Sequence, residues 1–105
     1  MSNYSNISSK CKIGIGVKIG RFCIIEDDVE IDDGALIEDY AMLLKGSKIG
    51  KNTKIGTYTK IGKNVTIGAD CSFTSYCEIR DNCQLGDRVI MGSRGTLSAG
   101  TIVED

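Results

Sequence analysis

The sequence predicts an all-β protein, a parallel β-helix built from six-residue repeats. The first observation is an apolar residue at every sixth position through the whole chain, without an insertion. From Ile49 to Ile67 this residue is followed by glycine four times in succession. The apolar positions are Ile7, Ile13, Ile19, Ile25, Ile31, Ile37, Leu43, Ile49, Ile55, Ile61, Ile67, Phe73, Ile79, Leu85, Met91, Leu97 and Val103. A short fixed period of this kind is the signature of a repeat architecture.

The second observation is a column of small residues, each two positions before an apolar one. Residues two apart on a strand point to the same face, so both columns are expected to face the interior. The small positions are Ser5, Cys11, Val17, Cys23, Val29, Ala35, Ala41, Ser47, Thr53, Thr59, Val65, Cys71, Cys77, Cys83, Val89, Gly95 and Thr101. A narrow prism needs such a pairing of one bulky and one small residue in each short strand.

In this repeat an aliphatic residue is followed by glycine, and a small residue stands four positions after the aliphatic one. This pattern resembles the hexapeptide-repeat family. The resemblance implies a left-handed parallel β-helix, in which three hexapeptides form one triangular coil. We therefore predict a left-handed β-helix domain over residues 7–105, a little under six triangular coils. Residues 1–6 are polar and are expected to form an N-terminal lead-in.

The third residue after each apolar position is expected at a corner of the triangle. Two of the three corners carry mostly Gly, Asn or Asp, which tolerate a left-handed backbone. The third corner carries aromatic residues before Arg94 ends the series, and these residues are Tyr4, Phe22, Tyr40, Tyr58 and Tyr76. Rings one rung apart are close enough to stack, which predicts an aromatic ladder along this edge. The other interpretation is a platform for a ligand.

Outward apolar residues gather beside the aromatic edge. They form a predicted patch of Ile24, Leu36, Tyr40, Met42 and Leu44, which we call the apolar patch. Isolated monomers seldom leave such a patch exposed to water. The resemblance implies a homotrimer of subunits packed side by side, and the apolar patch is the predicted subunit interface. The alternative is scattered exposed apolar residues without consequence.

The charge pattern excludes some function classes. The net charge of −1 gives no electrostatic reason to expect a nucleic acid or membrane partner. The chain has no apolar run of the roughly 20 residues that span a bilayer and no signal-peptide core, so we expect a cytoplasmic protein. An acidic band over residues 26–39 is followed by a basic band over residues 45–60. One interpretation is that both bands are solvated surfaces whose opposite charges attract one another. The other is that the lysines of the basic band bind the phosphates of a substrate.

All five cysteines fall in the small inward column. The pairs Cys23–Cys77 and Cys11–Cys83 lie three and four coils apart, which is too far for a disulfide. Cys71, Cys77 and Cys83 fall on successive faces of one coil, as core fillers or as a metal or redox cluster. Their spacing matches no Cys-x-x-Cys motif, which favours reduced, metal-free core fillers.

Two stretches, Ile19 to Ile31 and Met91 to Asp105, resemble acyltransferases that act on nucleotide-linked amino sugars. This resemblance implies acetyl-coenzyme A or another acyl-coenzyme A as co-substrate and a nucleotide sugar as acceptor. Many such enzymes use histidine as the general base, and this sequence has no histidine. The zinc carbonic anhydrases of the same fold need three histidine ligands and are therefore excluded.

The catalytic and cofactor-binding residues stay unassigned, because no spacing distinguishes one of the 14 carboxylates. Two interpretations of function remain. One is an acyl-coenzyme A-dependent acyltransferase that N-acetylates a nucleotide-linked amino sugar, or the β-helix portion of such an enzyme. The other is a non-catalytic hexapeptide-repeat scaffold that acts in oligomer assembly.

Overall fold

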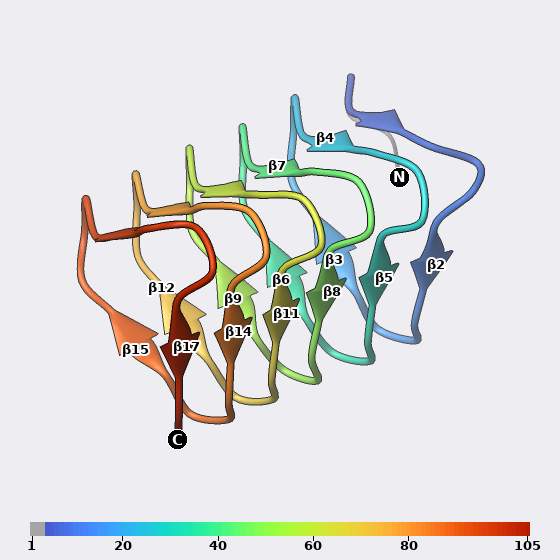
Figure 1. Ribbon diagram of the computed structural model, residues 1–105. Helices are drawn as coiled ribbons and strands as arrows, with labels where there is room; N and C mark the ends of the chain where they lie inside the picture. Colours follow the sequence, from blue (N-terminus) through green and yellow to red (C-terminus); the bar gives the residue numbers. More distant parts are fainter. Residues whose placement is uncertain (1–3) are drawn as a thin grey trace.

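A computed structural model describes residues 4–105, so the first three residues of the predicted lead-in lie outside the described residues. Seventeen strands of two residues follow one another at six-residue intervals (Figure 1). They are β1 (Asn6–Ile7), β2 (Lys12–Ile13), β3 (Lys18–Ile19), β4 (Ile24–Ile25), β5 (Glu30–Ile31), β6 (Leu36–Ile37), β7 (Met42–Leu43), β8 (Lys48–Ile49), β9 (Lys54–Ile55), β10 (Lys60–Ile61), β11 (Thr66–Ile67), β12 (Ser72–Phe73), β13 (Glu78–Ile79), β14 (Gln84–Leu85), β15 (Ile90–Met91), β16 (Thr96–Leu97) and β17 (Ile102–Val103).

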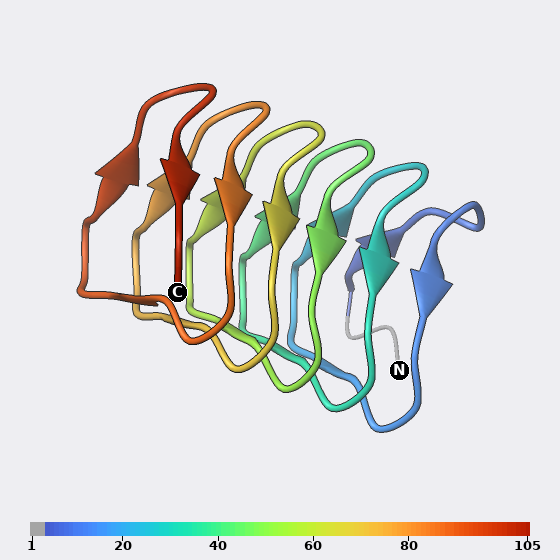
Figure 2. The same cartoon turned by 60° about the horizontal axis from the view of Figure 1, so that its bottom comes forward.

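The strands form the three sides of a triangular prism. Face A has the order β1-β4-β7-β10-β13-β16, face B the order β2-β5-β8-β11-β14-β17, and face C the order β3-β6-β9-β12-β15. Every pairing is parallel and joins residues eighteen apart, such as Ile25 and Leu43. The chain turns in the left-handed sense as it advances (Figure 1), and Figure 2 shows the three sides enclosing the interior. The predicted left-handed β-helix is confirmed.

The apolar column fills the interior of the prism. From Ile25 to Leu85 each of its members is buried, and so are the small residues beside them. The end coils are less covered, because each has a neighbouring coil on one side only among the described residues. Ile13 in the first coil is 37% exposed for this reason.

Hydroxyls and thiols of the small column donate to backbone carbonyls inside the prism, with Ser47 as an exception. Thr53 Oγ1 donates to the Gly68 carbonyl at 2.7 Å, and Cys71 Sγ donates to the Gly86 carbonyl at 3.2 Å. Donor and acceptor are fifteen residues apart in both bonds. Ser47 has the same place in its hexapeptide but on face B, and its buried Oγ has no partner among residues 4–105.

The corners adopt the left-handed backbone that the sequence predicts. From Tyr4 to Gly100, every corner residue except Lys10 has a positive φ. We name the edges after the faces they join. The A–B and B–C edges use Gly, Asn and Asp for this conformation, with Arg88 as the exception. On the C–A edge the aromatic residues have φ between 58° and 64°, and Arg94 has 65°.

Glycine after the apolar residue has a packing role that the sequence alone does not show. At Gly68 a Cβ would collide with Asp87 Oδ1 and lie 2.7 Å from the Gly86 carbonyl. The space left by the missing side chain admits the Asp87 carboxylate, which accepts a hydrogen bond from the Ala69 backbone N–H at 2.8 Å. The same arrangement recurs at the glycine–aspartate pairs Gly14–Asp33, Gly20–Asp39, Gly62–Asp81 and Gly86–Asp105.

Candidate functional site

The aromatic edge is a continuous stack of five rings. Successive ring centroids, from Tyr4 through Phe22, Tyr40 and Tyr58 to Tyr76, are 5.5, 5.2, 4.6 and 5.1 Å apart. The planes of neighbouring rings differ by 5° to 14°. The faces of the inner rings are therefore covered by their neighbours, and a ligand meets only ring edges and hydroxyls. This geometry favours the structural ladder over a stacking platform for a ligand.

The stack affects the chemistry of Tyr58, its fourth ring. Desolvation within the stack, and then the neighbouring Tyr40 and Tyr76 side chains, raise the pKa of Tyr58 above its ordinary value.

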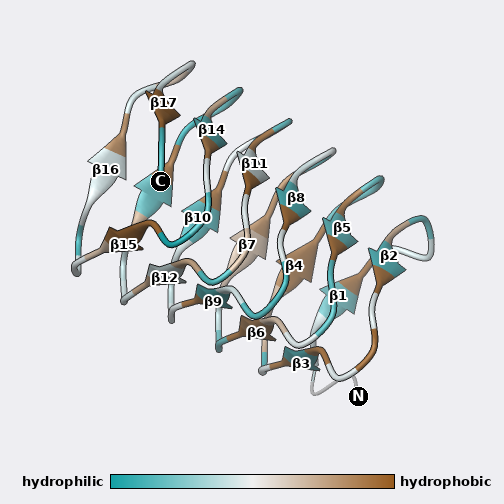
Figure 3. Cartoon of the chain, turned by 90° about the horizontal axis from the view of Figure 1, so that it is seen from below, coloured by the Kyte–Doolittle hydropathy of each residue, from teal (hydrophilic) through white to brown (hydrophobic). Residues whose placement is uncertain are grey.

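The apolar patch lies on both sides of this edge. On face A, Ile24 and Met42 occupy neighbouring strands in register, and Leu44 follows Met42. On face C, Leu36 lies between Lys18 and Lys54, as Figure 3 shows by the brown strand β6 between the teal strands β3 and β9.

Three members of the apolar patch, Ile24, Leu36 and Tyr40, are exposed by 37%, 36% and 42%, whereas Met42 and Leu44 are half-buried. The structure thus brings Ile24 and Met42 together and places Leu36 across the edge from them. The apolar patch is a ridge rather than a flat surface.

The carboxyl-terminal part of the same edge is polar. Here Ser93 Oγ donates to Thr74 Oγ1 at 3.2 Å, and Thr74 Oγ1 donates to the Met91 carbonyl at 3.2 Å. The Arg94 guanidinium carbon lies 4.9 Å from the centroid of the Tyr76 ring and continues the stack. Sequence analysis places Arg94 at the end of the aromatic series, but its contact with Tyr76 is a finding of the structure.

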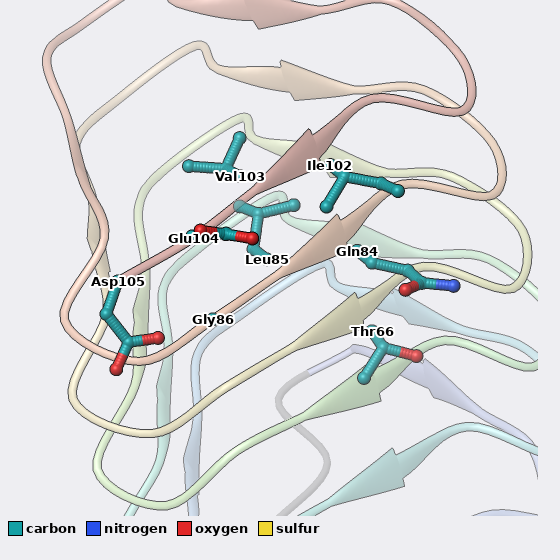
Figure 4. A pocket seen from close by; sticks show the side chains of 8 residues that line it. All are labelled: Thr66, Gln84, Leu85, Gly86, Ile102, Val103, Glu104 and Asp105. Atoms are coloured by element: carbon teal, nitrogen blue, oxygen red, sulfur yellow. The ribbon is translucent and has the colours of Figure 1, made fainter.

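A shallow groove crosses face B near its carboxyl-terminal end (Figure 4). Thr66, Gln84 and Ile102 project outward from the neighbouring strands β11, β14 and β17. The lining is completed by Leu85, Gly86, Val103, Glu104 and Asp105, so its polar side chains are an amide, a hydroxyl and two carboxylates. These groups suit hydroxyl or amine ligands, and the groove contains no cation for a phosphate.

The charged bands lie on neighbouring coils, as the sequence predicts. Lys48 is in register with Glu30 on face B, while Lys54 Nζ and Glu38 Oε2 are 3.7 Å apart on face C. The Lys54–Glu38 pair is exposed, so its contribution to stability is small.

The cysteines are free thiols inside the small column. Cys77 and Cys83 donate to the carbonyls of Gly92 and Ser98, at 3.2 and 3.1 Å. Burial raises the pKa of the Cys23 and Cys71 thiols above the ordinary value, which makes them weaker nucleophiles at neutral pH.

Within residues 4–105, no three Cys, Asp or Glu side chains converge in a way that could hold a metal ion. The same residues contain no helix with the length and apolar character that crossing a bilayer requires.

Comparisons with known proteins agree with this architecture. Residues 46–81 match the family described as bacterial transferase hexapeptide (six repeats). A UDP-N-acetylglucosamine acyltransferase superposes with a TM-score of 0.64 at 24% identity, over 96% of this chain and 51% of that protein. A hexapeptide transferase family protein from Anaplasma phagocytophilum superposes with a TM-score of 0.66 at 21% identity, over 95% of this chain and 69% of that protein. No curated protein matches the sequence.

At these identities the structural likeness shows the fold, and the chain spans about half the length of that acyltransferase. The repeat match lies in the centre of the unbroken six-residue period, and the whole described chain follows the same coil geometry. Residues 46–81 are therefore similar to the bacterial transferase hexapeptide repeat, and the chain has a left-handed β-helix fold like that of these two structures.

Proposed function

We propose that this chain is an acyl-coenzyme A-dependent acyltransferase, or the β-helix portion of one, that N-acetylates a nucleotide-linked amino sugar. The observation that carries the proposal is the match of residues 46–81 to the bacterial transferase hexapeptide repeat. The structural likeness to a UDP-N-acetylglucosamine acyltransferase supports a nucleotide-linked sugar as the acceptor, and the choice of an amine as the acceptor group rests on the absence of histidine. The protein acts in the cytoplasm in this proposal.

The acceptor group is an amine rather than a hydroxyl. A hydroxyl acceptor usually needs a positioned general base with a pKa near neutrality, and the sequence has no histidine. The remaining bases are carboxylates, whose ordinary pKa is about 4. A sugar amine supplies its own lone pair once it is deprotonated, so it reacts without such a base.

Acetyl-coenzyme A release, measured with paired amino- and hydroxy-sugar nucleotides, tests the activity. We expect turnover of the amino sugar, with a rate that rises with pH toward the pKa of the amine and shows no plateau near 6.5. Faster turnover of the hydroxy sugar contradicts the choice of acceptor. No turnover of either sugar favours the scaffold.

In this proposal the assembly is a homotrimer that buries the apolar patch. Changing Met42 and Leu44 together to glutamate is expected to give monomers in sedimentation velocity, because two charges would be buried at the contact. The matched control is Ile90→Glu, since Ile90 is 78% exposed but lies outside the apolar patch. Trimers that survive the double change, or dissociate equally with Ile90→Glu, contradict the assignment of the interface.

The alternative function is a non-catalytic scaffold. It is favoured by the regularity of the chain, in which all seventeen strands follow at the same interval and no loop protrudes from residues 4–105. A stable trimer that neither binds acyl-coenzyme A nor turns over a sugar nucleotide would establish this alternative.

A further inference from the structure

Two arginines occupy left-handed corners of the last coil, and their side chains have different partners. Arg88, with φ 60°, donates from Nη2 to Asp105 Oδ2 at 2.7 Å, so its charge is neutralised within the chain. Arg94, with φ 65°, lies over the Tyr76 ring instead. Among residues 4–105 no carboxylate forms an ion pair with Arg94.

The contact with Tyr76 places the Arg94 guanidinium carbon over the ring, 4.9 Å from its centroid. A guanidinium carries its five N–H donors in its own plane, so a ring beneath it uses none of them. Arg94 is exposed, so the N–H donors that its contact with the ring does not use face the solvent. An oriented cation with unused donors loses less conformational freedom when it binds an anion.

The surroundings of Arg94 add hydroxyls and little negative charge. Ser93 precedes Arg94 in the chain, and its hydroxyl donates a hydrogen bond to Thr74 Oγ1 at 3.2 Å. The Ser93 hydroxyl can also rotate toward a ligand. The carboxylate beside this end of the edge, Glu78, pairs with Arg80 at 3.7 Å. The pair of Glu78 and Arg80 is neutral, which leaves Arg94 as the net charge at this end of the edge.

We infer that Arg94 is an anion-binding residue that holds a phosphate group of a phosphorylated ligand at the carboxyl-terminal end of the aromatic edge. Phosphate oxygens accept two parallel N–H bonds from a guanidinium, which a single ammonium cannot supply in the same geometry. The inference rests on the proposed function, because acyl-coenzyme A and nucleotide sugars both carry phosphates. It adds the place where one of them is held.

The test uses inorganic pyrophosphate as the first probe and follows the arginine Nε–Hε signals by NMR. We expect a saturable shift of the Arg94 signal and a smaller change at Arg88. The change Arg94→Gln should weaken pyrophosphate binding about tenfold or more, whereas the matched control Arg88→Gln should bind as the wild type does. Arg94→Lys, which keeps the charge, should bind with intermediate affinity and also serves if Arg94→Gln fails to fold.

Two further pairs of probes identify the source of the phosphate. The first pair is coenzyme A and its 3′-dephospho form. If the wild type binds coenzyme A more tightly than the dephospho form, and Arg94→Gln binds both equally, the phosphate belongs to the acyl donor. The same pattern between UDP and uridine assigns it to the sugar nucleotide. Unchanged pyrophosphate affinity in Arg94→Gln, or no binding to the wild type, overturns the inference.

The result separates this inference from the proposed function. Turnover of an amino-sugar nucleotide with the same KM in wild type and Arg94→Gln rejects the role of Arg94 and keeps the acyltransferase. Pyrophosphate binding that depends on Arg94, without any turnover, keeps the anion site and rejects the acyltransferase.

Discussion

The B–C edge and the C–A edge share one backbone conformation but stabilise it in different ways. On the B–C edge, residues such as Gly34 and Asn52 adopt positive φ at low cost. Aspartates accept hydrogen bonds from the neighbouring coil beside both edges, such as Asp87 at the B–C edge and Asp39 at the C–A edge. On the C–A edge, aromatic residues adopt the same φ, which costs about 1–2 kcal/mol for an ordinary side chain. Each stacked ring pair contributes about 0.5–1.5 kcal/mol, which offsets much of that cost.

The difference bears on function because it decides which groups face the solvent. On the B–C edge the carboxylates of Asp87 and Asp105 are used within the stack of coils. On the C–A edge the aromatic rings are themselves exposed, with the apolar patch around Tyr40 and with Arg94 at the carboxyl-terminal end. We therefore place both the proposed subunit contact and the proposed anion site on the C–A edge.

The largest expected effect is at the close fit between coils beside the B–C edge. Gly68→Ala places a Cβ 2.7 Å from the Gly86 carbonyl, so the backbone must shift, and we expect a loss of about 2–3 kcal/mol. Urea unfolding measures this loss. The matched control beside the C–A edge is Gly92→Ala, because a Cβ there meets no atom within 4 Å. Equal destabilisation by both changes would show that the packing of neighbouring coils does not depend on this fit.

An intermediate effect is expected when an aromatic corner residue of the C–A edge is replaced by asparagine, a residue type found at the corners of the other two edges. Tyr58→Asn keeps a residue that tolerates positive φ but removes the stacks at 4.6 and 5.1 Å. We expect a net loss of about 1–2 kcal/mol in thermal unfolding, since two ring pairs outweigh the relief of backbone strain. Tyr58→Phe, which keeps the rings stacked, should differ little from the wild type. A Tyr58→Asn protein more stable than the wild type would mean that the ladder serves binding rather than stability.

The smallest effect concerns the aspartate bonds of the B–C edge. Asp87→Ala removes the acceptor of the Ala69 N–H, and we expect a loss of about 1 kcal/mol. Asp87→Asn supplies an amide oxygen at the same place and should restore most of the stability. If both variants are equally destabilised, the carboxylate charge rather than the hydrogen bond is responsible.

The architecture was predictable because every level of it repeats. A residue and the one eighteen positions later lie one rung apart, so the inward columns and the aromatic stack follow from counting along the chain. The corner conformation was predictable for the same reason, and Lys10, in the first coil, is the exception. A fixed period places backbone positions, and those positions decide which side chains share a face.

Only the tertiary structure decides which side chains of neighbouring coils are long enough and oriented to touch one another. The fit of Asp87 into the space above Gly68 joins residues nineteen apart, one position off the repeat, and column counting does not reveal it. The same holds for Arg88 and Arg94, which have equivalent corner conformations. A carboxylate happens to lie within reach of Arg88, whereas the ring below Arg94 leaves its N–H donors exposed. The period positions the two residues alike, and their rotamers and neighbours make one structural and the other available to a ligand.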